Sequence, residues 1–171
     1  MKIGDAVFID ILKDIASKNK TVIRLACKGR SKFEGWLKFE IAKKLAEERL
    51  EVSLEKNRFD IAVSDKKNDD FIIELKTANM NYRIRGIENK HRPVTKNFKG
   101  ISQDIEKIKR SGKKGKVVFV VFPIPVNDGR YLKRIERVQK NTGVYIIQNF
   151  QHIENNYGIA LCESEVINLK E

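Results

Sequence analysis

The run from Val117 to Phe122 constrains the fold more than any other segment of this chain. It consists only of valine and phenylalanine, with no polar residue alternating among them. This pattern is typical of a strand that is buried on both faces, and such a strand needs helices above and below the sheet. The run therefore predicts the α/β class, with a central mixed β-sheet flanked by α-helices.

Helices predicted before and after this run can cover the two faces of the sheet. Apolar residues recur at helical intervals in four segments, residues 5–17, 31–49, 102–110 and 131–140. Ser31 and Glu34 have the spacing of a capping box, which predicts the start of the second segment. Gly143 lies just past the last segment, where a glycine commonly follows a helix end. We expect a helix in each of the four.

The remaining regular segments are typical of strands. Residues 51–54, 59–63 and 71–75 are β-prone, and a polar turn at 65–70 joins the last two, which predicts a β meander. Residues 144–148 and 158–162 are the final strand candidates. Between Thr77 and Lys99 no clear period is visible. Because a loop of that length in a compact domain is usually functional, we expect it to face the substrate.

The length of 171 residues suits a single domain that buries its own core without disulfides. We expect residues 1–171 to form that domain, with a helical extension over 1–30 and the core over 31–165. Cys27 and Cys162 are far apart and belong to no paired-thiol motif, which argues against zinc and favours a reducing, cytoplasmic setting. His91 and His152 lack metal-ligand spacing, so we expect surface or packing roles for them.

No segment has the character of a membrane span or a signal peptide. The longest apolar run, residues 117–126, is interrupted by Pro123 and Pro125. We therefore expect no membrane partner.

The positive charge is concentrated in one part of the chain. Lys and Arg outnumber Asp and Glu by 35 to 23, a net charge of +12. Residues 83–116 hold twelve basic and three acidic residues, so nine of the net charges lie there. Such a cluster favours binding to a polyanion over an ordinary solvated surface. DNA is the partner we expect.

A small group of charged residues carries the expected chemistry. Residues alternate faces along a strand, so Glu74 and Lys76 share one face of the strand that ends there. Asp60 precedes Glu74 by thirteen intervening residues, enough for a strand and a turn that bring the two carboxylates together. Two carboxylates with a backbone carbonyl form the oxygen-rich environment that Mg²⁺ prefers. On spacing alone, a solvated strand edge with a weak surface ion pair is the simpler interpretation.

These residues also resemble a known signature. Arg58-Phe-Asp60-Ile-Ala-Val, followed by Ile72-Ile-Glu74-Leu-Lys76-Thr, is similar to the motif of the PD-(D/E)xK nuclease superfamily, with Phe59 in place of the motif's proline. The resemblance implies a restriction-endonuclease-like core and a Mg²⁺-dependent nuclease, with Mn²⁺ as a substitute. It assigns metal binding to Asp60, Glu74 and the carbonyl of Leu75. It assigns Lys76 to positioning or activating the attacking water.

The same resemblance implies a further acidic residue from the preceding helix. Glu34 and Glu40 compete for that role, and we favour Glu34 because it lies on the stripe that faces the sheet, although a capping-box role also accounts for it. Gln103 and Asp104 could touch the site from the next helix, but acidic residues in a first turn are common dipole partners.

The loop after the motif supplies the expected nucleic-acid contacts. They are the aromatic and basic residues Tyr82, Arg83, Arg85, Lys90, Arg92 and Lys96. We expect a small DNA endonuclease of the restriction type. We expect it to be a homodimer, because cutting both strands of a duplex needs two symmetric sites. A Holliday-junction resolvase or repair nuclease of the same superfamily and a non-cutting nucleic-acid-binding protein remain alternatives. The choice of DNA over RNA and the number of metal ions stay open.

Overall fold

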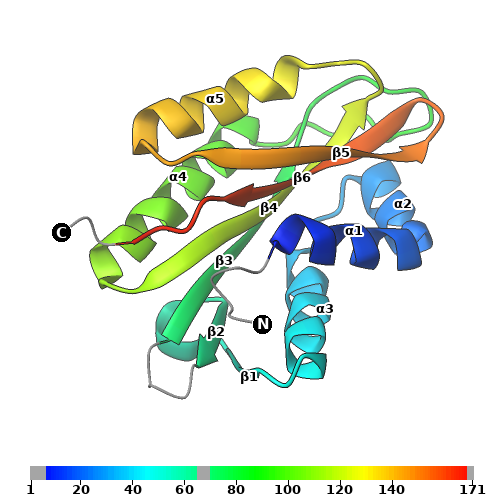
Figure 1. Ribbon diagram of the computed structural model, residues 1–171. Coiled ribbons are helices and arrows are strands. Elements are labelled where there is room, and N and C mark those ends of the chain that lie inside the picture. The colour runs from blue at the N-terminus through cyan, green and yellow to red at the C-terminus, as the bar shows by residue number, and fades with distance from the viewer. Residues whose placement is uncertain (1–6, 65–69, 169–171) are drawn as a thin grey trace.

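The computed structural model describes residues 7–64 and 70–168, which form a six-stranded mixed sheet (Figure 1). The strands are β1 (Glu51–Leu54), β2 (Ile61–Ser64), β3 (Asp70–Asn79), β4 (Lys114–Pro125), β5 (Ile146–Glu154) and β6 (Tyr157–Ser164). Their order across the sheet is β1-β2-β3-β4-β6-β5. β3 and β4 are parallel, whereas the other neighbouring pairs are antiparallel.

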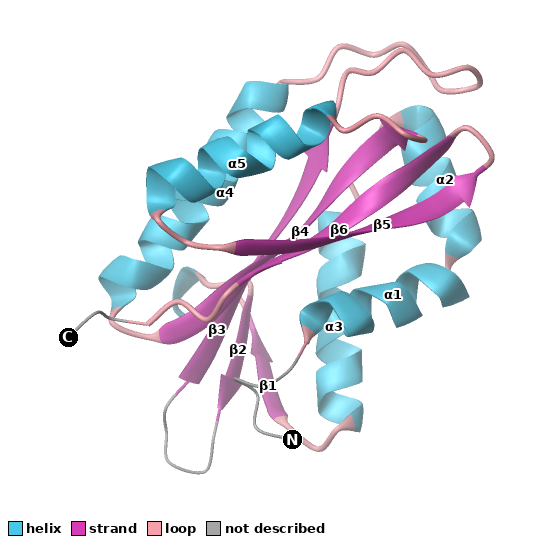
Figure 2. Ribbon diagram, turned by 45° about the horizontal axis from the view of Figure 1, so that its top comes forward, coloured by secondary structure: helices cyan, strands magenta, loops and turns pink. Residues whose placement is uncertain are grey.

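Helices cover both faces of this sheet. They are α1 (Phe8–Lys18), α2 (Lys20–Gly29), α3 (Glu34–Glu47), α4 (Val94–Ser111) and α5 (Arg130–Thr142), with a short 3-10 turn at Lys56–Arg58. α1, α2 and α3 pack on one face, and α4 and α5 pack on the other (Figures 1 and 2). The α/β class with a mixed sheet flanked by helices is therefore confirmed.

The predicted central strand lies inside β4 and is buried on both faces. Val118, Val120 and Phe122 belong to the apolar cluster under α1, α2 and α3. Their neighbours Val117, Phe119 and Val121 belong to the cluster under α4 and α5. The absence of polar alternation in this run is explained by these two cores, because neither face of the strand reaches water.

Residues 7–30, the described part of the expected N-terminal extension, contain two helices where one was expected. The expected start of the first helix, at residue 5, lies outside the described residues, and α2 was not predicted. α1 contributes Phe8 and Leu12 to the same apolar cluster as α3. Its first turn is held by Glu163 of β6, whose carboxylate accepts a hydrogen bond of 2.6 Å from the backbone N–H of Ile9. Both helices therefore belong to the layer that covers the sheet.

Two helix starts differ from the prediction. α3 begins at Glu34 after Phe33 as N-cap, without a side-chain cap, so the capping box of Ser31 and Glu34 does not form. α4 begins at Val94, eight residues before the predicted start, because Phe98 and the other apolar residues of its first turns already face the sheet. The segment between β3 and α4 is accordingly shortened to residues 80–93.

This shortened loop is fastened by Arg30, a fully buried residue at the end of α2. The guanidinium donates hydrogen bonds to the backbone carbonyls of Met80, Tyr82 and Glu88. The loop runs out beyond the carboxyl end of β3 in Figure 2. Because one side chain satisfies three of its carbonyls, the loop has a defined path despite its lack of regular structure. The predicted turn residues 65–69 lie outside the described residues. No helix in the described ranges is long and apolar enough to cross a bilayer.

Candidate active site

The candidate site lies where the edge of β3 loses its strand partner. β2 pairs with β3 only as far as Ile61 opposite Ile73, whereas β3 continues to Asn79. Carboxylates replace the missing strand. Asp60 Oδ2 accepts the N–H of Leu75 at 2.9 Å, and Glu34 Oε2 accepts the N–H of Thr77 at 2.8 Å. In a β-strand the C=O and the N–H of one residue point toward the same side of the strand. The carbonyl of Leu75 therefore faces the same opening as its N–H.

Glu74 and Lys76 lie on the face of β3 that α4 covers, as their alternation with Ile73 and Leu75 predicts. Glu74 is only 3 % exposed. Its carboxylate forms an ion pair with Lys107 of α4, whose ammonium also donates to the carbonyl of Arg58. Burial makes the ionised form of a carboxylate unfavourable, and a single ammonium partner offsets this cost only in part.

The two metal-ligand candidates Asp60 and Glu74 lie next to each other. Antiparallel pairing of β2 and β3 puts Ile61 opposite Ile73, and Asp60 accepts the N–H of Leu75, the residue after Glu74. The pKa of Glu74 is raised to about 7, chiefly by burial and also by the neighbouring carboxyl group of Asp60, while Lys107 opposes the rise. The two strands therefore bring the carboxyl groups together, as the spacing predicts.

Lys76 is held by an acidic residue of α4. Its Nζ lies 3.1 Å from Asp104 Oδ2, and both side chains are mostly buried. Burial alone would lower the pKa of Lys76, but the charge of Asp104 reverses this effect and the pKa is raised. The pKa of Asp104 is raised by burial, against the opposing charge of Lys76. Lys76 is therefore an ammonium at neutral pH, which suits it to stabilising negative charge and excludes it as a neutral base in this state.

Lys38 of α3 is a site residue that was not predicted. Its Nζ lies 2.6 Å from Glu55 and 3.6 Å from Asp60 Oδ1, and hydrogen bonding to Glu55 raises its pKa. It follows Glu34 by one helical turn, so the two side chains reach the same opening from α3. Lys107 was also missed, although it follows Asp104 by three residues on α4. Both lysines lie one helical turn after an acidic candidate, Lys38 after Glu34 and Lys107 after Asp104, and this spacing would have identified them.

The chemistry of these donors suits Mg²⁺, but the donor set is small. Across residues 7–64 and 70–168, no three carboxylate, histidine or cysteine side chains gather closely enough to form a metal centre. Asp60, Glu74 and the Leu75 carbonyl offer hard oxygen donors, which favour Mg²⁺ over zinc. Glu34 is directed to Thr77, so its carboxylate is a neighbour of this set. Glu40 makes no ion pair or side-chain hydrogen bond within the described parts of the chain.

The residues predicted to contact nucleic acid lie in and beside the loop at 80–93. Arg83, Arg85, Lys90 and Lys96 are exposed, and Arg92 is half-buried. Tyr82 is buried, with the guanidinium of Arg130 lying 4.7 Å from its ring centre. His91 lines the same loop, while His152 is on β5, edge-on to Phe150 at 5.2 Å.

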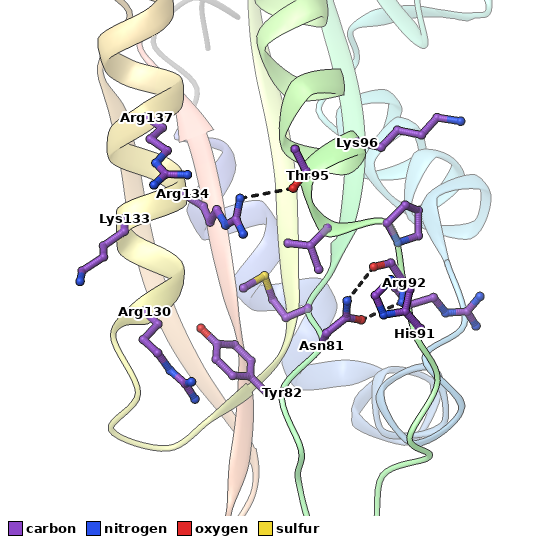
Figure 3. Close-up of a pocket in the computed structure, with 13 residues that line it drawn as sticks. Asn81, Tyr82, His91, Arg92, Thr95, Lys96, Arg130, Lys133, Arg134 and Arg137 are labelled. Carbon is purple, nitrogen blue, oxygen red and sulfur yellow. Dashed lines mark hydrogen bonds between the residues drawn. The ribbon is translucent and has the colours of Figure 1, made fainter.

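Basic residues of α5, which were not predicted to contact nucleic acid, also approach this loop. Arg130, Lys133, Arg134 and Arg137 line a groove with the loop and the start of α4 (Figure 3). Their spacing along the helix was visible in the sequence. No family model, curated protein or solved structure matches this chain.

Proposed function

We propose that this protein is a Mg²⁺-dependent endonuclease that hydrolyses phosphodiester bonds of DNA on a restriction-endonuclease-like core. One observation carries the proposal: Asp60 and Glu74 are adjacent at an unpaired strand edge, with Lys76 on the face of Glu74. The Leu75 carbonyl shares the opening with Asp60. This combination supports the roles that the sequence motif implies.

Asp60, Glu74 and the Leu75 carbonyl would hold the metal ion. When bound there, Mg²⁺ supplies Lewis acidity toward a phosphate oxygen and lowers the pKa of a coordinated water. Glu74 must be ionised to serve as a ligand, although its pKa of about 7 leaves it half-protonated at neutral pH. Metal binding at this site therefore releases a proton over the physiological range.

Lys107 and Lys76 have different tasks in this proposal. Lys107 is the counter-ion of Glu74 in the metal-free protein, so its ammonium must leave that carboxylate when a divalent cation binds. Lys107 is partly exposed and has a flexible side chain, which makes this exchange feasible. Lys76 keeps its charge through Asp104 and can orient a water or neutralise charge that develops on the phosphate.

The decisive experiment incubates the purified protein with supercoiled plasmid, linear duplex, four-way junction and single-stranded DNA, with Mg²⁺, Mn²⁺ or EDTA. We expect cleavage with either metal and none with EDTA. Glu74→Gln and Lys76→Ala should lose cleavage, whereas Glu40→Gln, on the same helix as Glu34, should retain it. Metal-independent cleavage, or full activity of Glu74→Gln, would contradict the proposal. Preference for the junction would identify the resolvase alternative.

A non-cutting DNA-binding protein is the competing function, and one observation favours it. Each carboxylate of the site already has a lysine partner, with Lys107 on Glu74, Lys76 on Asp104 and Lys38 near Asp60. If these ion pairs persist, the site never admits a metal. DNA binding without cleavage of any of the four substrates, together with no Mg²⁺ binding in calorimetry, would support this function. The expected homodimer is measured by sedimentation in the same conditions.

A further inference from the structure

A basic groove separates the start of α4 from the first half of α5. It encloses about 770 Å³ and is bordered on its third side by Asn81, Tyr82 and His91 of the loop (Figure 3). No acidic side chain lines it. The groove begins at Met80, four residues beyond Lys76 along the chain, which corresponds to about 13 Å of extended backbone. It is therefore near the candidate active site but distinct from it.

One face of α5 carries only basic side chains in its first two turns. Arg130, Lys133, Arg134 and Arg137 recur at intervals of three, one and three residues, which places them on one stripe of the helix. A second stripe, beside the first, carries Tyr131, Ile135 and Val138, which are buried against the sheet. The sheet thus fixes the rotation of α5, and in Figure 3 Arg134 and Arg137 extend toward the groove, whereas Lys133 extends from the outer side of the helix.

Three of these four cations are not neutralised by any residue that the structure describes. Arg130 pairs with Asp128, but Lys133, Arg134 and Arg137 form no ion pair with any described residue. Arg134 has only a long 3.5 Å contact with the hydroxyl of Thr95. Like charges on adjacent helical turns repel each other, so the arrangement is unfavourable until an anion is bound.

Two polar side chains form the floor of the groove. Tyr82 is only 7 % exposed, and its ring lies against the guanidinium of Arg130. Its hydroxyl and the Nε of Arg92 are both shielded from solvent. These two atoms therefore support the groove from below, and the exposed cations above them are the groups that can contact an anion.

The N-terminus of α4 adds to this positive field. This 18-residue helix begins after Pro93 with no side-chain cap and no acidic residue in its first turn. Val94 N–H donates to the carbonyl of Arg92, and the helix dipole favours an anion at that end. Thr95 and Lys96, at the same end, line the groove.

We propose that this groove binds consecutive phosphates of a nucleic-acid backbone. The stripe from Arg130 to Arg137 spans about 10 Å of helix, which corresponds to about three base-pair steps along a duplex axis and exceeds what one phosphate needs. A polymer therefore fits better than a mononucleotide. This inference rests on the proposed function for the identity of the polymer, but binding at the groove requires no cleavage.

The test measures binding of fluorescein-labelled duplex and single-stranded DNA by anisotropy, in EDTA, over a series of NaCl concentrations. The test variant carries Lys133→Ala, Arg134→Ala and Arg137→Ala. The control carries Lys20→Ala, Lys43→Ala and Arg49→Ala, which remove the same charge from exposed positions of α2 and the α3 end. Circular dichroism checks that both are folded, and the single variant Arg137→Glu repeats the test with less perturbation.

We expect the groove variant to bind DNA about tenfold more weakly or worse, with a salt slope reduced by about 2 to 3, and the control to change little. Equal losses in both triple variants, or no loss in the groove variant, would overturn the proposal. So would loss of binding to anionic phospholipid vesicles with DNA affinity unchanged. Cleavage assays separate the two claims: a wild type that binds through the groove but never cuts leaves the groove intact and removes the nuclease.

Discussion

Ionisation of Glu74 should destabilise the metal-free protein, and the effect should follow pH in a defined direction. The pKa of this carboxyl is about 7 in the folded chain, above its ordinary value of 4.5. Between these values the folded state binds more protons than the unfolded state. The free energy of unfolding therefore falls as pH rises from 4.5 to 7 and levels off above that. Below pH 4.5 the carboxyl is neutral in both states and has no effect of this kind.

The size of the effect follows from the same two values. At 1.36 kcal/mol per pKa unit, the gap between 4.5 and about 7 corresponds to about 3 kcal/mol. A typical domain unfolds with about 5 to 15 kcal/mol, so the change is a substantial share of the total. Glu74→Gln removes the titrating group and leaves a neutral side chain of nearly the same size.

Urea unfolding in EDTA at a series of pH values between 4.5 and 8 measures this. We expect the wild type to lose about 3 kcal/mol relative to Glu74→Gln across that range. Glu40→Gln is the matched control and should follow the wild-type curve, since Glu40 has no partner among the described residues. Saturating Mg²⁺ should restore the wild type at pH 8 and leave Glu74→Gln unchanged. Parallel curves for the wild type and Glu74→Gln would refute the reasoning.

Three further outcomes are expected. Mg²⁺ affinity of the wild type, measured by calorimetry, should be about tenfold weaker at pH 6 than at pH 8, because a pKa near 7 leaves most of Glu74 protonated at the lower pH; equal affinities would exclude Glu74 as a ligand. Arg30→Ala should cost about 3 kcal/mol or more in urea unfolding, because it strands the carbonyls of Met80, Tyr82 and Glu88, and it should expose residues 80–93 to trypsin. Gly115→Ala should cost about 1 to 3 kcal/mol, because its Cβ would lie 2.4 Å from the carbonyl oxygen of Ile72 on the parallel neighbour strand, whereas Gly129→Ala, with its nearest atom at 3.5 Å, should be nearly neutral.

The parts of the fold that were predicted correctly are those whose burial is visible locally. β4 is recognisable because both of its faces are apolar, and α5 because its apolar stripe ends at Gly143, which adopts the left-handed conformation at the helix end. The start of α4 was missed because Asn97 and Gly100 weaken the helical signal there, although Phe98 continues the stripe. α2 was missed because it buries only three residues, while two other apolar residues, Val22 and Leu25, are exposed, so its burial does not follow from its apolar pattern.

Only the residues that belong to the sequence motif could be predicted directly for the candidate site. Asp60, Glu74 and Lys76 follow from spacing and strand alternation. Their partners do not follow from the motif: helical spacing from Asp104 points to Lys107 as a neighbour of the site, but its pairing with Glu74 depends on how α4 packs on the sheet. Glu34 illustrates the same limit. Its position near Ser31 predicts a helix cap. In the structure its carboxylate instead accepts a hydrogen bond from the N–H of Thr77, forty-three residues away at the open edge of β3.

The geometry of β3 explains why charged groups collect at this point. β3 continues past the end of β2, and its exposed N–H groups must be satisfied by something other than a strand. Carboxylates of Asp60 and Glu34 do this, and their presence beside the buried Glu74 concentrates negative charge that lysines from α3 and α4 then neutralise. Each of these lysines carries its charge on a long, flexible side chain, and their positive charge balances the carboxylates without using the N–H groups of the strand. The requirement to complete a sheet edge therefore explains why carboxylates and lysines gather at this one point.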